Sequence, residues 1–531
     1  MNPAPKSDSS SARTAAVIQI SSDGLYCEVA EARKDDSLKI LERLEHPFNF
    51  AQDTFSTGKI RYDKVEKTCE VLNGFKKIIQ EYRVSRVRTT ATTALREASN
   101  ARFIIDQINA KTHLNVEVLE DAKEKSYIYG QMLDVINRSP RYSKEDLLMA
   151  YIGTGSLGIA EFSGGSILFS QNIRIGTLKL FEILGDLQDS YDRFSMIVNE
   201  YLSSFKHPIH SLLPLKKVKR LVSCGKEIQM IARLCNAKEK DDFLSISQKA
   251  FFDAFEQIKD QTPRQVAEKY KIPETKAQIL LPFFGIYRML LDIIETDSIL
   301  VIPARLTDAL LREMLFKEEA KKKKADLEKT SLLSARNLGE RFFYDTGHAQ
   351  RVETYCLELF DGMKKIHRLG QRPRLMLRVA AILHDAGKYI HLKKHALHSF
   401  NIIKDSELPG LTSRELQVVA HVARLHSQEF LDVDNMELGP LTVEESILTA
   451  KLLAILRIAD ALDRSHSEKI DRIGVKAKPE EIRVVVHTAR DISLETWAVE
   501  KKVDFFEEVF GYKLRLKRGK PDEKPQRTPE G

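Results

Sequence analysis

The stretch LLMAYIGTGSLGIAEFSGGSILFSQNIRIG, residues 147–176, decides the fold expected for this chain of 531 residues. An apolar strand leads into a Gly/Ser turn, and a second strand, a second turn and a third strand follow. Residues 15–31, AAVIQISSDGLYCEVAE, show the same strand–turn–strand order about 130 residues earlier. This repetition predicts two related α/β halves.

Other segments complete the predicted organisation. Ser85–Asn100 predicts a short strand, a Thr-rich turn and a helix start, and Leu215–Cys235 predicts a strand, a Gly turn and a helix. Residues 247–300 are expected to be mostly helical, residues 335–475 to be helical without a strand pattern, and residues 478–517 to return to α/β. The segment FKEEAKKKKADLEK (316–329) predicts a solvated helical connector, with an anion-binding strip as the alternative.

The composition narrows the class of protein. Hydrophobic residues make up 43% and charged residues 30% of the chain, which is typical of a soluble globular protein. A net charge of +7 suits an anionic ligand but predicts no specific nucleic-acid partner. The five scattered cysteines form no CxxC pair, which favours a reducing compartment. Neither a membrane span nor a signal peptide is evident, so a cytoplasmic location is expected.

Four polar positions in the helical region point to a metal site. His348 lies near a helix start, His384 and Asp385 follow a buried helical face, and Asp460 follows another apolar stripe. Burial of such groups costs a few kcal/mol unless a partner compensates them. Imidazole and carboxylate ligands hold divalent transition metals. His398, His421 and His426 are further candidates for a second ion or for supporting hydrogen bonds.

This H…HD…D order resembles the HD superfamily of metal-dependent phosphohydrolases. The resemblance implies that His348, His384, Asp385 and Asp460 are the metal ligands. Lys388 fits the HDxxK form of the motif and is expected to meet a phosphate oxygen. A metal bound there would lower the pKa of a bound water and polarise phosphorus.

In the first half, the Gly/Ser turns at Ser21–Gly24 and Gly153–Ser156 suit phosphate binding through backbone N–H groups. Two such turns facing each other across a cleft form the phosphate clamp of the actin and hexokinase architecture. The segment TTATTALREASNARFI (89–104) is more specific, because it resembles the ATxALReAxNxxxF motif of the exopolyphosphatase/guanosine pentaphosphate phosphohydrolase (Ppx/GppA) family. The resemblance spans nearly the whole chain and is to the longer members, which carry an HD-like third domain and a small α/β fourth domain.

The resemblance implies two actin-like (ribonuclease-H-like) ATPase-type α/β lobes, an all-α HD domain and a small C-terminal α/β domain. The expected boundaries are a disordered tail over 1–12, lobe I over 13–135, lobe II over 136–312, a charged helical linker over 313–335, the HD-type domain over 336–475, the small α/β domain over 476–517 and a disordered tail over 518–531. It also implies a homodimer, a divalent metal (Mg or Mn, with a transition metal at the HD site) and polyphosphate or a guanosine nucleotide as the ligand. The implied phosphate-binding residues are Ser22, Arg96, Gly153, Gly155 and Ser156, and the implied general base is Glu124.

The sequence departs from the family motifs where the chemistry occurs. The residues that replace the family's usual ones are Gln19 (Asp), Ser21 (Gly), Tyr26 (Arg), Tyr151 (Asp), Leu157 (Thr) and Gly158 (Glu). In EDAKEK (120–125), Ala122 and Lys123 replace two of the family's three carboxylates, and Glu124 remains. The lost carboxylates would hold magnesium and orient the attacking water, so these changes predict weakened hydrolysis in the first cleft.

Three functions therefore stay open. The first is a Ppx/GppA-type phosphohydrolase that releases terminal phosphate from polyphosphate or guanosine pentaphosphate in the first cleft. The second is an HD-type metal phosphohydrolase of a nucleotide or phosphoester, with the actin-like half as a sensing module. The third is a non-catalytic polyphosphate- or nucleotide-binding scaffold.

Overall fold

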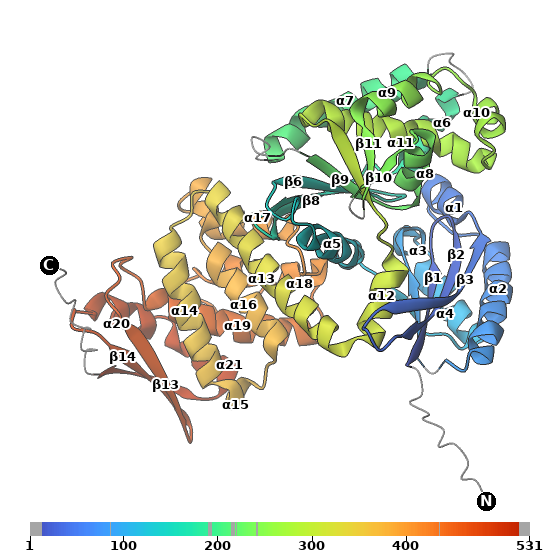
Figure 1. Cartoon of the computed structure of the whole chain (residues 1–531). Coiled ribbons are helices and arrows are strands. Elements are labelled where there is room, and N and C mark those ends of the chain that lie inside the picture. Colours follow the sequence, from blue (N-terminus) through green and yellow to red (C-terminus); the bar gives the residue numbers. More distant parts are fainter. Residues whose placement is uncertain are drawn as a thin grey trace, which may run out of the picture. The chain divides into compact units, whose positions relative to one another are not determined.

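A computed structural model describes residues 13–84, 86–188, 194–213, 218, 220–240, 243–434 and 436–519. The chain divides into two compact units, Met1–Leu327 and Glu328–Gly531, and Figure 1 shows the elements of each. The tail expected to be disordered over 1–12 and residues 520–531 of the one expected over 518–531 lie outside the described residues, whereas residues 518 and 519 belong to a strand.

Unit 1 opens with a five-stranded sheet in the order β3-β2-β1-β4-β5. β2 is antiparallel to both β1 and β3, whereas β1, β4 and β5 run parallel. The strands are β1 (Thr14–Ile20), β2 (Gly24–Ala32), β3 (Leu38–Pro47), β4 (Val87–Ala91) and β5 (Val116–Val118). The helices are α1 (Phe50–Thr57), α2 (Tyr62–Glu81), α3 (Thr93–Glu97), α4 (Ala101–Thr112) and α5 (Asp121–Arg138).

The second sheet of unit 1 has seven strands in the order β10-β11-β12-β9-β6-β7-β8. The strands are β6 (Leu147–Ile152), β7 (Leu157–Ser163), β8 (Ser166–Ile173), β9 (Arg220–Cys224), β10 (Lys238–Lys240), β11 (Phe243–Ser247) and β12 (Ser298–Ile302). The helices are α6 (Thr177–Gln188), α7 (Phe194–Leu212), α8 (Lys226–Leu234), α9 (Gln248–Glu256), α10 (Pro263–Tyr270), α11 (Glu274–Ile293) and α12 (Leu306–Leu315). Its segment β8-β7-β6-β9-β12 repeats the order and strand directions of the first sheet. The predicted duplication is therefore confirmed.

Burial explains why the central strands are apolar on both faces. β1 is buried at five of its seven positions, as expected for a strand covered on both sides by helices. One apolar cluster joins the two sheets, with Val17 from β1, Met132 from α5, Met149 from β6 and Leu310 from α12. The two halves of unit 1 thus share part of their core.

Unit 2 is helical, with a small sheet in the order β13-β14-β15. Its helices are α14 (Thr346–Gly362), α15 (Lys364–His367), α16 (Gln371–Leu383), the 3₁₀ helix η2 (Ala386–Tyr389), α17 (His395–Lys404), α18 (Ser413–Leu425), α19 (Val443–Ala461), α20 (Ser493–Glu500) and α21 (Val503–Phe510). Its strands are β13 (Arg472–Lys478), β14 (Glu481–His487) and β15 (Lys513–Gly519). α18 and α19 each begin at a capping box, because Thr412 and Thr442 exchange hydrogen bonds with Glu415 and Glu445.

The boundary between the helical part and the sheet differs from the prediction. β13 begins at Arg472, inside the region expected to lack strands, and β15 extends to Gly519. Only Ile473 of β13 is fully buried, so the strand has a weak apolar pattern. Its pairing with β14, whose Ile482, Val484 and Val486 are buried, makes it a strand.

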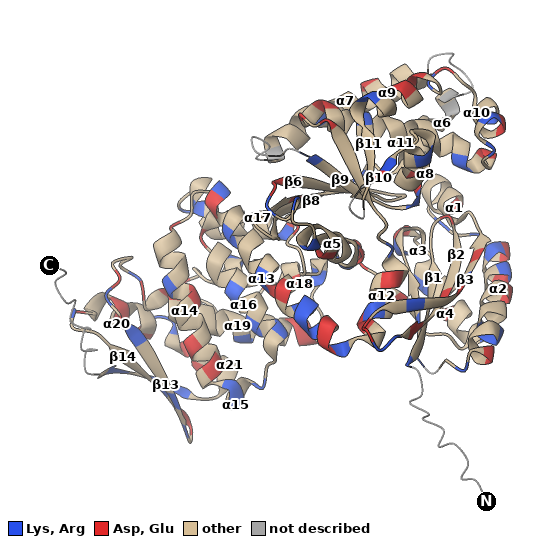
Figure 2. Cartoon of the chain, in the orientation of Figure 1, with Lys and Arg blue, Asp and Glu red and all other residues tan. Residues whose placement is uncertain are grey.

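The lysine-rich segment is part of α13 (Lys317–Arg341), the helix that carries the boundary between the units. Lys323 forms ion pairs with Asp134 and Glu319, at 2.6 and 3.0 Å. Lys321, Lys322 and Lys324 are exposed. Figure 2 shows basic and acidic residues interspersed along the described elements. These observations favour the solvated helix over the anion-binding strip.

All five cysteines are free and buried. Cys27, Cys69, Cys224 and Cys235 belong to unit 1, and Cys356 belongs to unit 2. Burial raises the pKa of the Cys27 and Cys235 thiols to about 12. Among the described residues, no helix combines the length and the apolar character that crossing a bilayer requires.

Candidate functional site

The two Gly/Ser turns of unit 1 face one another. The Ser21 N–H donates to the Gly24 carbonyl at 2.9 Å, and the Gly153 N–H donates to the Ser156 carbonyl at 2.8 Å, which closes each turn. The Thr154 hydroxyl donates to the Ser22 hydroxyl at 2.9 Å, so one hydrogen bond joins the turns. We call these two turns, with the side chains that contact them, the paired-turn site.

Gly176 supports the second turn by close backbone approach. A Cβ atom at this position would lie 2.3 Å from the Ser156 nitrogen and 2.4 Å from the carbonyl carbon of Gly155. The N–H groups that follow it, on Thr177 and Leu178, donate to the carbonyls of Gly153 and Thr154. The role of Gly176 was not predicted, because nothing in the sequence shows that the segment around Gly176 packs on the second turn.

Arg96 and Glu124, the predicted phosphate-binding residue and base, form an ion pair at 3.1 Å. Arg96 extends from α3, and its guanidinium also donates to Thr93 Oγ1 and to the Leu119 carbonyl. Burial raises the pKa of Glu124, and the Arg96 charge opposes that rise. A carboxyl group with a raised pKa beside an arginine suits proton transfer near a bound anion.

Lys125 and Asp121 add a second ion pair that the sequence analysis missed. The Lys125 ammonium lies 2.6 Å from Asp121 Oδ2 and 3.1 Å from Ser156 Oγ, and it also donates to Asn172 Oδ1. Asp121 also accepts from Arg96 at 3.1 Å. The i, i+4 spacing of Asp121 and Lys125 on α5 was the available signal, because such residues share a helix face.

The residues that depart from the family motifs face each other across equivalent hairpins. Gln19 pairs with Tyr26 between β1 and β2, and Tyr151 pairs with Gly158 between β6 and β7. The Tyr151 hydroxyl donates to Glu124 at 3.4 Å. A tyrosine therefore contacts the predicted base from the position where the family motif has an aspartate.

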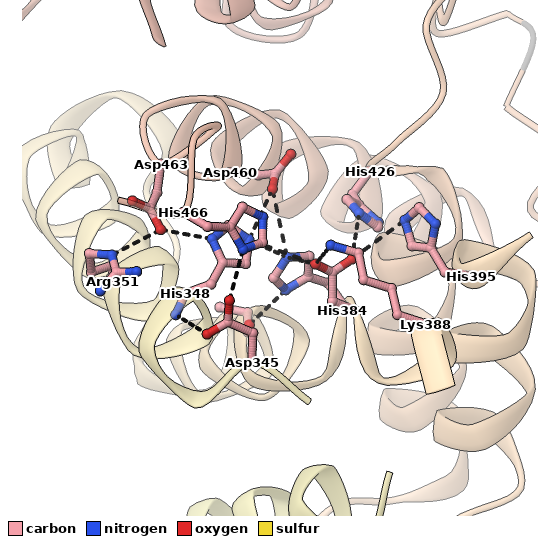
Figure 3. Close-up of polar contacts among 12 residues, drawn as sticks. Asp345, His348, Arg351, His384, Lys388, His395, His426, Asp460, Asp463 and His466 are labelled. Carbon is pink, nitrogen blue, oxygen red and sulfur yellow. Dashed lines mark hydrogen bonds and ion pairs between the residues drawn. The ribbon is translucent and has the colours of Figure 1, made fainter. Parts of the chain in front are cut away.

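In unit 2, the predicted ligands His348, His384 and Asp460 lie together (Figure 3). The fourth predicted ligand, Asp385, converges with His384 and His426. The Nε2 atoms of His348 and His384 are 3.3 Å apart. Asp460 Oδ1 lies 3.4 Å from His348 Nε2 and 3.7 Å from His384 Nε2, and Asp385 Oδ2 lies 3.8 and 3.6 Å from the same atoms. We call these four residues the His–Asp cluster. They come from α14, the end of α16, the turn before η2, and α19.

Hydrogen bonds and neighbouring charges shift the pKa values of His348, Asp385 and Asp460 in the His–Asp cluster. Burial lowers the pKa of His348, but hydrogen bonds with Asp460 and Asp463 outweigh burial and raise that pKa to about 9. Burial raises the pKa of Asp385, but the neighbouring His384, His426 and Lys388 hold it well below its usual range. Two imidazoles and two ionised carboxylates facing one point are a ligand set that fits a divalent ion.

Further residues surround the cluster. Lys388 forms an ion pair with Asp385, whose other oxygen lies 3.4 Å from His395 Nε2 and 3.7 Å from His426 Nε2. His466 stacks on His348 with ring centroids 3.7 Å apart. The converging groups of ligand atoms found in the described residues include His426 and His466 but not His398 or His421. His421 packs against Phe400 instead.

Sequence comparison assigns the chain to a family. The model of the Ppx/GppA phosphatase family matches residues 29–318, more than half of the chain. The chain belongs to the Ppx/GppA phosphatase family. The model of domain III of Ppx/GppA phosphatases matches residues 332–502, which include the whole His–Asp cluster.

The Ppx/GppA chain is similar to a guanosine-5'-triphosphate,3'-diphosphate pyrophosphatase from Photobacterium profundum. The two are 21% identical over 441 residues, which cover 82% of this chain and 84% of the relative. It is also similar to the crystal structure of an exopolyphosphatase from Cytophaga hutchinsonii, with 19% identity and a TM-score of 0.50 over 57% of this chain and 97% of the other. A Ppx/GppA family member from Aquifex aeolicus gives 22% identity and a TM-score of 0.48 over 57% and 98% of the two chains.

Membership in the Ppx/GppA family makes this protein a phosphohydrolase that acts on phosphoanhydride bonds. The structural neighbour supports the predicted actin-like fold of unit 1. Enzymes of the family generally depend on a divalent metal ion. In the described residues, the groups of three or more converging ligand atoms that could hold such an ion lie in unit 2.

Proposed function

We propose that this phosphohydrolase releases the terminal phosphate of inorganic polyphosphate or guanosine pentaphosphate at the paired-turn site. The observation that carries the proposal is the Arg96–Glu124 ion pair beside the two facing turns. The named activities of the pyrophosphatase and exopolyphosphatase relatives support the substrate class. The site thus combines a cation for phosphate with a carboxyl group for water.

Each residue has a role in this proposal. Backbone N–H groups of Gly155 and Ser156, with Ser22 from the opposite turn, hold the oxygens of the terminal phosphate. The Gly153 N–H, predicted to share this role, instead donates to the Ser156 carbonyl and shapes the turn. Arg96 neutralises charge that develops on the phosphate, and Glu124 takes a proton from the attacking water. Arg96 must then exchange part of its contact with Glu124 for the phosphate, which frees the carboxylate.

Phosphate release from polyphosphate by Glu124→Gln tests the proposal. We expect a loss of about 10²-fold or more, because the amide cannot accept the proton. Glu117→Gln is the matched control, because Glu117 also forms an ion pair with an arginine. Its carboxylate on β5 lies 2.9 Å from the Arg88 guanidinium on β4. Equal activity of the Glu124 and Glu117 variants would place the reaction elsewhere.

The His–Asp cluster supports a second candidate function, an HD-type metal phosphohydrolase of a nucleotide or phosphoester. The observation that favours it is the overlap of converging groups of three ligand atoms, which bring His348, the neighbours His384 and Asp385, and Asp460 together from three segments. A divalent ion held by His348, His384, Asp385 and Asp460 would act as a Lewis acid on a phosphoryl oxygen. Lys388, already paired with Asp385, is placed to meet a second oxygen of the same phosphate.

Asp385→Ala separates the two candidates. If unit 2 performs the chemistry, this variant loses both bound metal, measured by elemental analysis, and activity on a nucleotide panel. Asp405→Ala is the control, since Asp405 is exposed at the end of α17 and pairs with Lys404 at 3.6 Å. Retention of full activity by Asp385→Ala, with loss in Glu124→Gln, assigns the reaction to unit 1.

The proposal includes a homodimer, which the family resemblance implies, and a cytoplasmic location, which the sequence features described above favour. Five free thiols agree with a reducing compartment. Light scattering after size-exclusion chromatography measures the mass in solution, and a monomer of 60.6 kDa would contradict the dimer.

A further inference from the structure

We infer that the paired-turn site binds a phosphate chain without a divalent ion, because the Lys125 ammonium supplies the fixed positive charge there. The inference rests on the proposed function in one respect, namely that the phosphate is bound at these turns. It concerns binding and not the rate of hydrolysis. The ligand class is an inorganic phosphoanhydride chain.

The position of Lys125 is the first observation. Its side chain is only 6% exposed, and its ammonium reaches Ser156, a residue of the turn that is proposed to hold phosphate. An ammonium has three donors, and here they meet Asp121, Ser156 and Asn172. A phosphate oxygen held by the turn can replace the Ser156 hydroxyl as one of these acceptors. The cation is therefore already in place before the ligand arrives.

Gly158 is the second observation, because it provides the space for Lys125. A Cβ atom at position 158 would lie 2.9 Å from Lys125 Cε and 2.5 Å from the Tyr129 hydroxyl. A carboxylate side chain at this position would have to displace the lysine. The Lys125 side chain thus occupies the space that an acidic side chain at position 158 would need, and glycine at that position leaves this space free.

The carboxylates of the site give the third observation. Asp121 is bound by Arg96 and Lys125, and Glu124 by Arg96 and Tyr151. A divalent ion would have to compete with Arg96 and Lys125 for these two carboxylates, and Asp23 of the first turn already accepts a hydrogen bond from the Tyr26 hydroxyl. The three groups of converging ligand atoms in the described residues all lie in unit 2. The paired turns therefore offer no preformed set of three ligands for a divalent ion among the described residues.

Calorimetric titration of the full chain with inorganic tripolyphosphate tests the inference. In excess EDTA, we expect the wild-type Kd to change less than about 2-fold from its value with magnesium. Lys125→Met should weaken binding about 10-fold or more, the range for a hydrogen bond to a charged group. Lys123→Met is the matched control, because Lys123 lies on the same helix and pairs with Glu117 at 2.6 Å. We expect its Kd to stay within about 2-fold of wild type.

Two further variants keep the test sharp. Lys125→Arg retains the positive charge and should recover most of the affinity. In the double variant Lys125→Met/Asp121→Asn, the carboxylate that would lose its lysine partner is also neutralised. Because no unpaired charge then destabilises the fold, weak binding by this folded variant cannot be assigned to misfolding. Full affinity of the double variant would overturn the inference.

The outcomes separate the inference from the proposed function. Binding that disappears in EDTA and returns with magnesium overturns the inference and leaves the proposed function standing. Binding that persists in EDTA and needs Lys125, in a protein that releases no phosphate, upholds the inference and refutes the proposed function. A protein that neither binds tripolyphosphate nor hydrolyses polyphosphate refutes both.

Discussion

Asp463 lies directly behind the His348 imidazole. Its carboxylate accepts a hydrogen bond from Arg351 Nε at 2.9 Å and lies 2.8 Å from His348 Nδ1. With Nδ1 donating to Asp463, a divalent ion would replace the proton on Nε2, the ring nitrogen that faces Asp460 and His384. Such supporting carboxylates fix the tautomer and the orientation of a metal-binding histidine. Asp463 follows α19 in a turn, and no motif in the sequence identified it.

We therefore expect Asp463→Asn to weaken metal binding about 10- to 100-fold, since the amide holds the His348 ring less firmly. Titration of the metal-free protein with Mn²⁺, followed by calorimetry, measures the effect. Asp361→Asn is the control, because Asp361 lies on the same helix as His348. Its exposed carboxylate pairs with the Arg374 guanidinium at 2.6 Å. Unchanged affinity in Asp463→Asn would remove the proposed role.

Gly176→Ala tests the contact behind the second turn. Its methyl group would overlap the backbone of Gly155 and Ser156, so the turn has to shift. We expect a destabilisation of about 1–3 kcal/mol and a marked loss of phosphate release. Gly185→Ala, inside α6, meets only Phe181 at 3.6 Å and should be neutral or slightly stabilising. Urea midpoints of the two variants compare them, and equal midpoints would contradict the close packing.

At the scale of elements, the histidines around the cluster use helix ends in the same way. His384 and His426 follow the last residues of α16 and α18, and their Nδ1 atoms donate to the carbonyls of Ala381 and Ala423 at 2.8 and 2.7 Å. Helix ends leave such carbonyls without intrahelical partners. The hydrogen bond satisfies the carbonyl and turns Nε2 toward Asp385. This geometry depends on where each helix ends, which the sequence locates only to within a few residues.

His421, inside α18, contributes to the pH dependence of stability. Burial and the Arg424 charge lower the pKa of His421 to about 4. Because the folded-state pKa lies below the unfolded value of about 6.5, the unfolded chain binds the extra proton between these values. The stabilisation is complete above about pH 6.5 and is lost as the pH falls toward 4, with an upper limit of about 3 kcal/mol.

We expect His421→Leu to flatten this dependence. Unfolding of unit 2 can be followed through Trp497 in α20, the one tryptophan of the chain. Urea midpoints at about pH 5 and about pH 7.5 should differ less in the variant than in wild type. His113→Asn, which removes an exposed histidine from unit 1, should keep the wild-type difference. An unchanged difference in His421→Leu would show that another group causes it.

At the scale of the molecule, the two units differ in how far the sequence predicts them. The repeated hairpins at Gly24 and Gly153 predicted the duplicated sheet correctly, because strand alternation and turn residues are local signals. The His–Asp cluster was predicted as a set because its members stand in a recognisable order. Lys125 and Asn172 were missed because their contact joins α5 to β8, and local patterns do not encode such pairs.

Metal binding should stabilise one unit and not the whole chain. If the cluster holds a divalent ion only when folded, Mn²⁺ at about 100 times its Kd stabilises unit 2 by about 2.7 kcal/mol. The Trp497 fluorescence transition should then shift to higher urea, and the shift should vanish in His348→Ala. The same shift in wild type and His348→Ala would show that the ion binds elsewhere.

The placement of the thiols gives each unit its own chemical reporter. Four buried cysteines belong to unit 1, whereas Cys356 alone belongs to unit 2 and is fully covered. A maleimide reacts with a covered thiol only when the surrounding structure opens. Peptide mass spectrometry distinguishes Cys356 from the other four cysteines. The alkylation rate of Cys356 therefore reports the opening of unit 2 separately, without any engineered label.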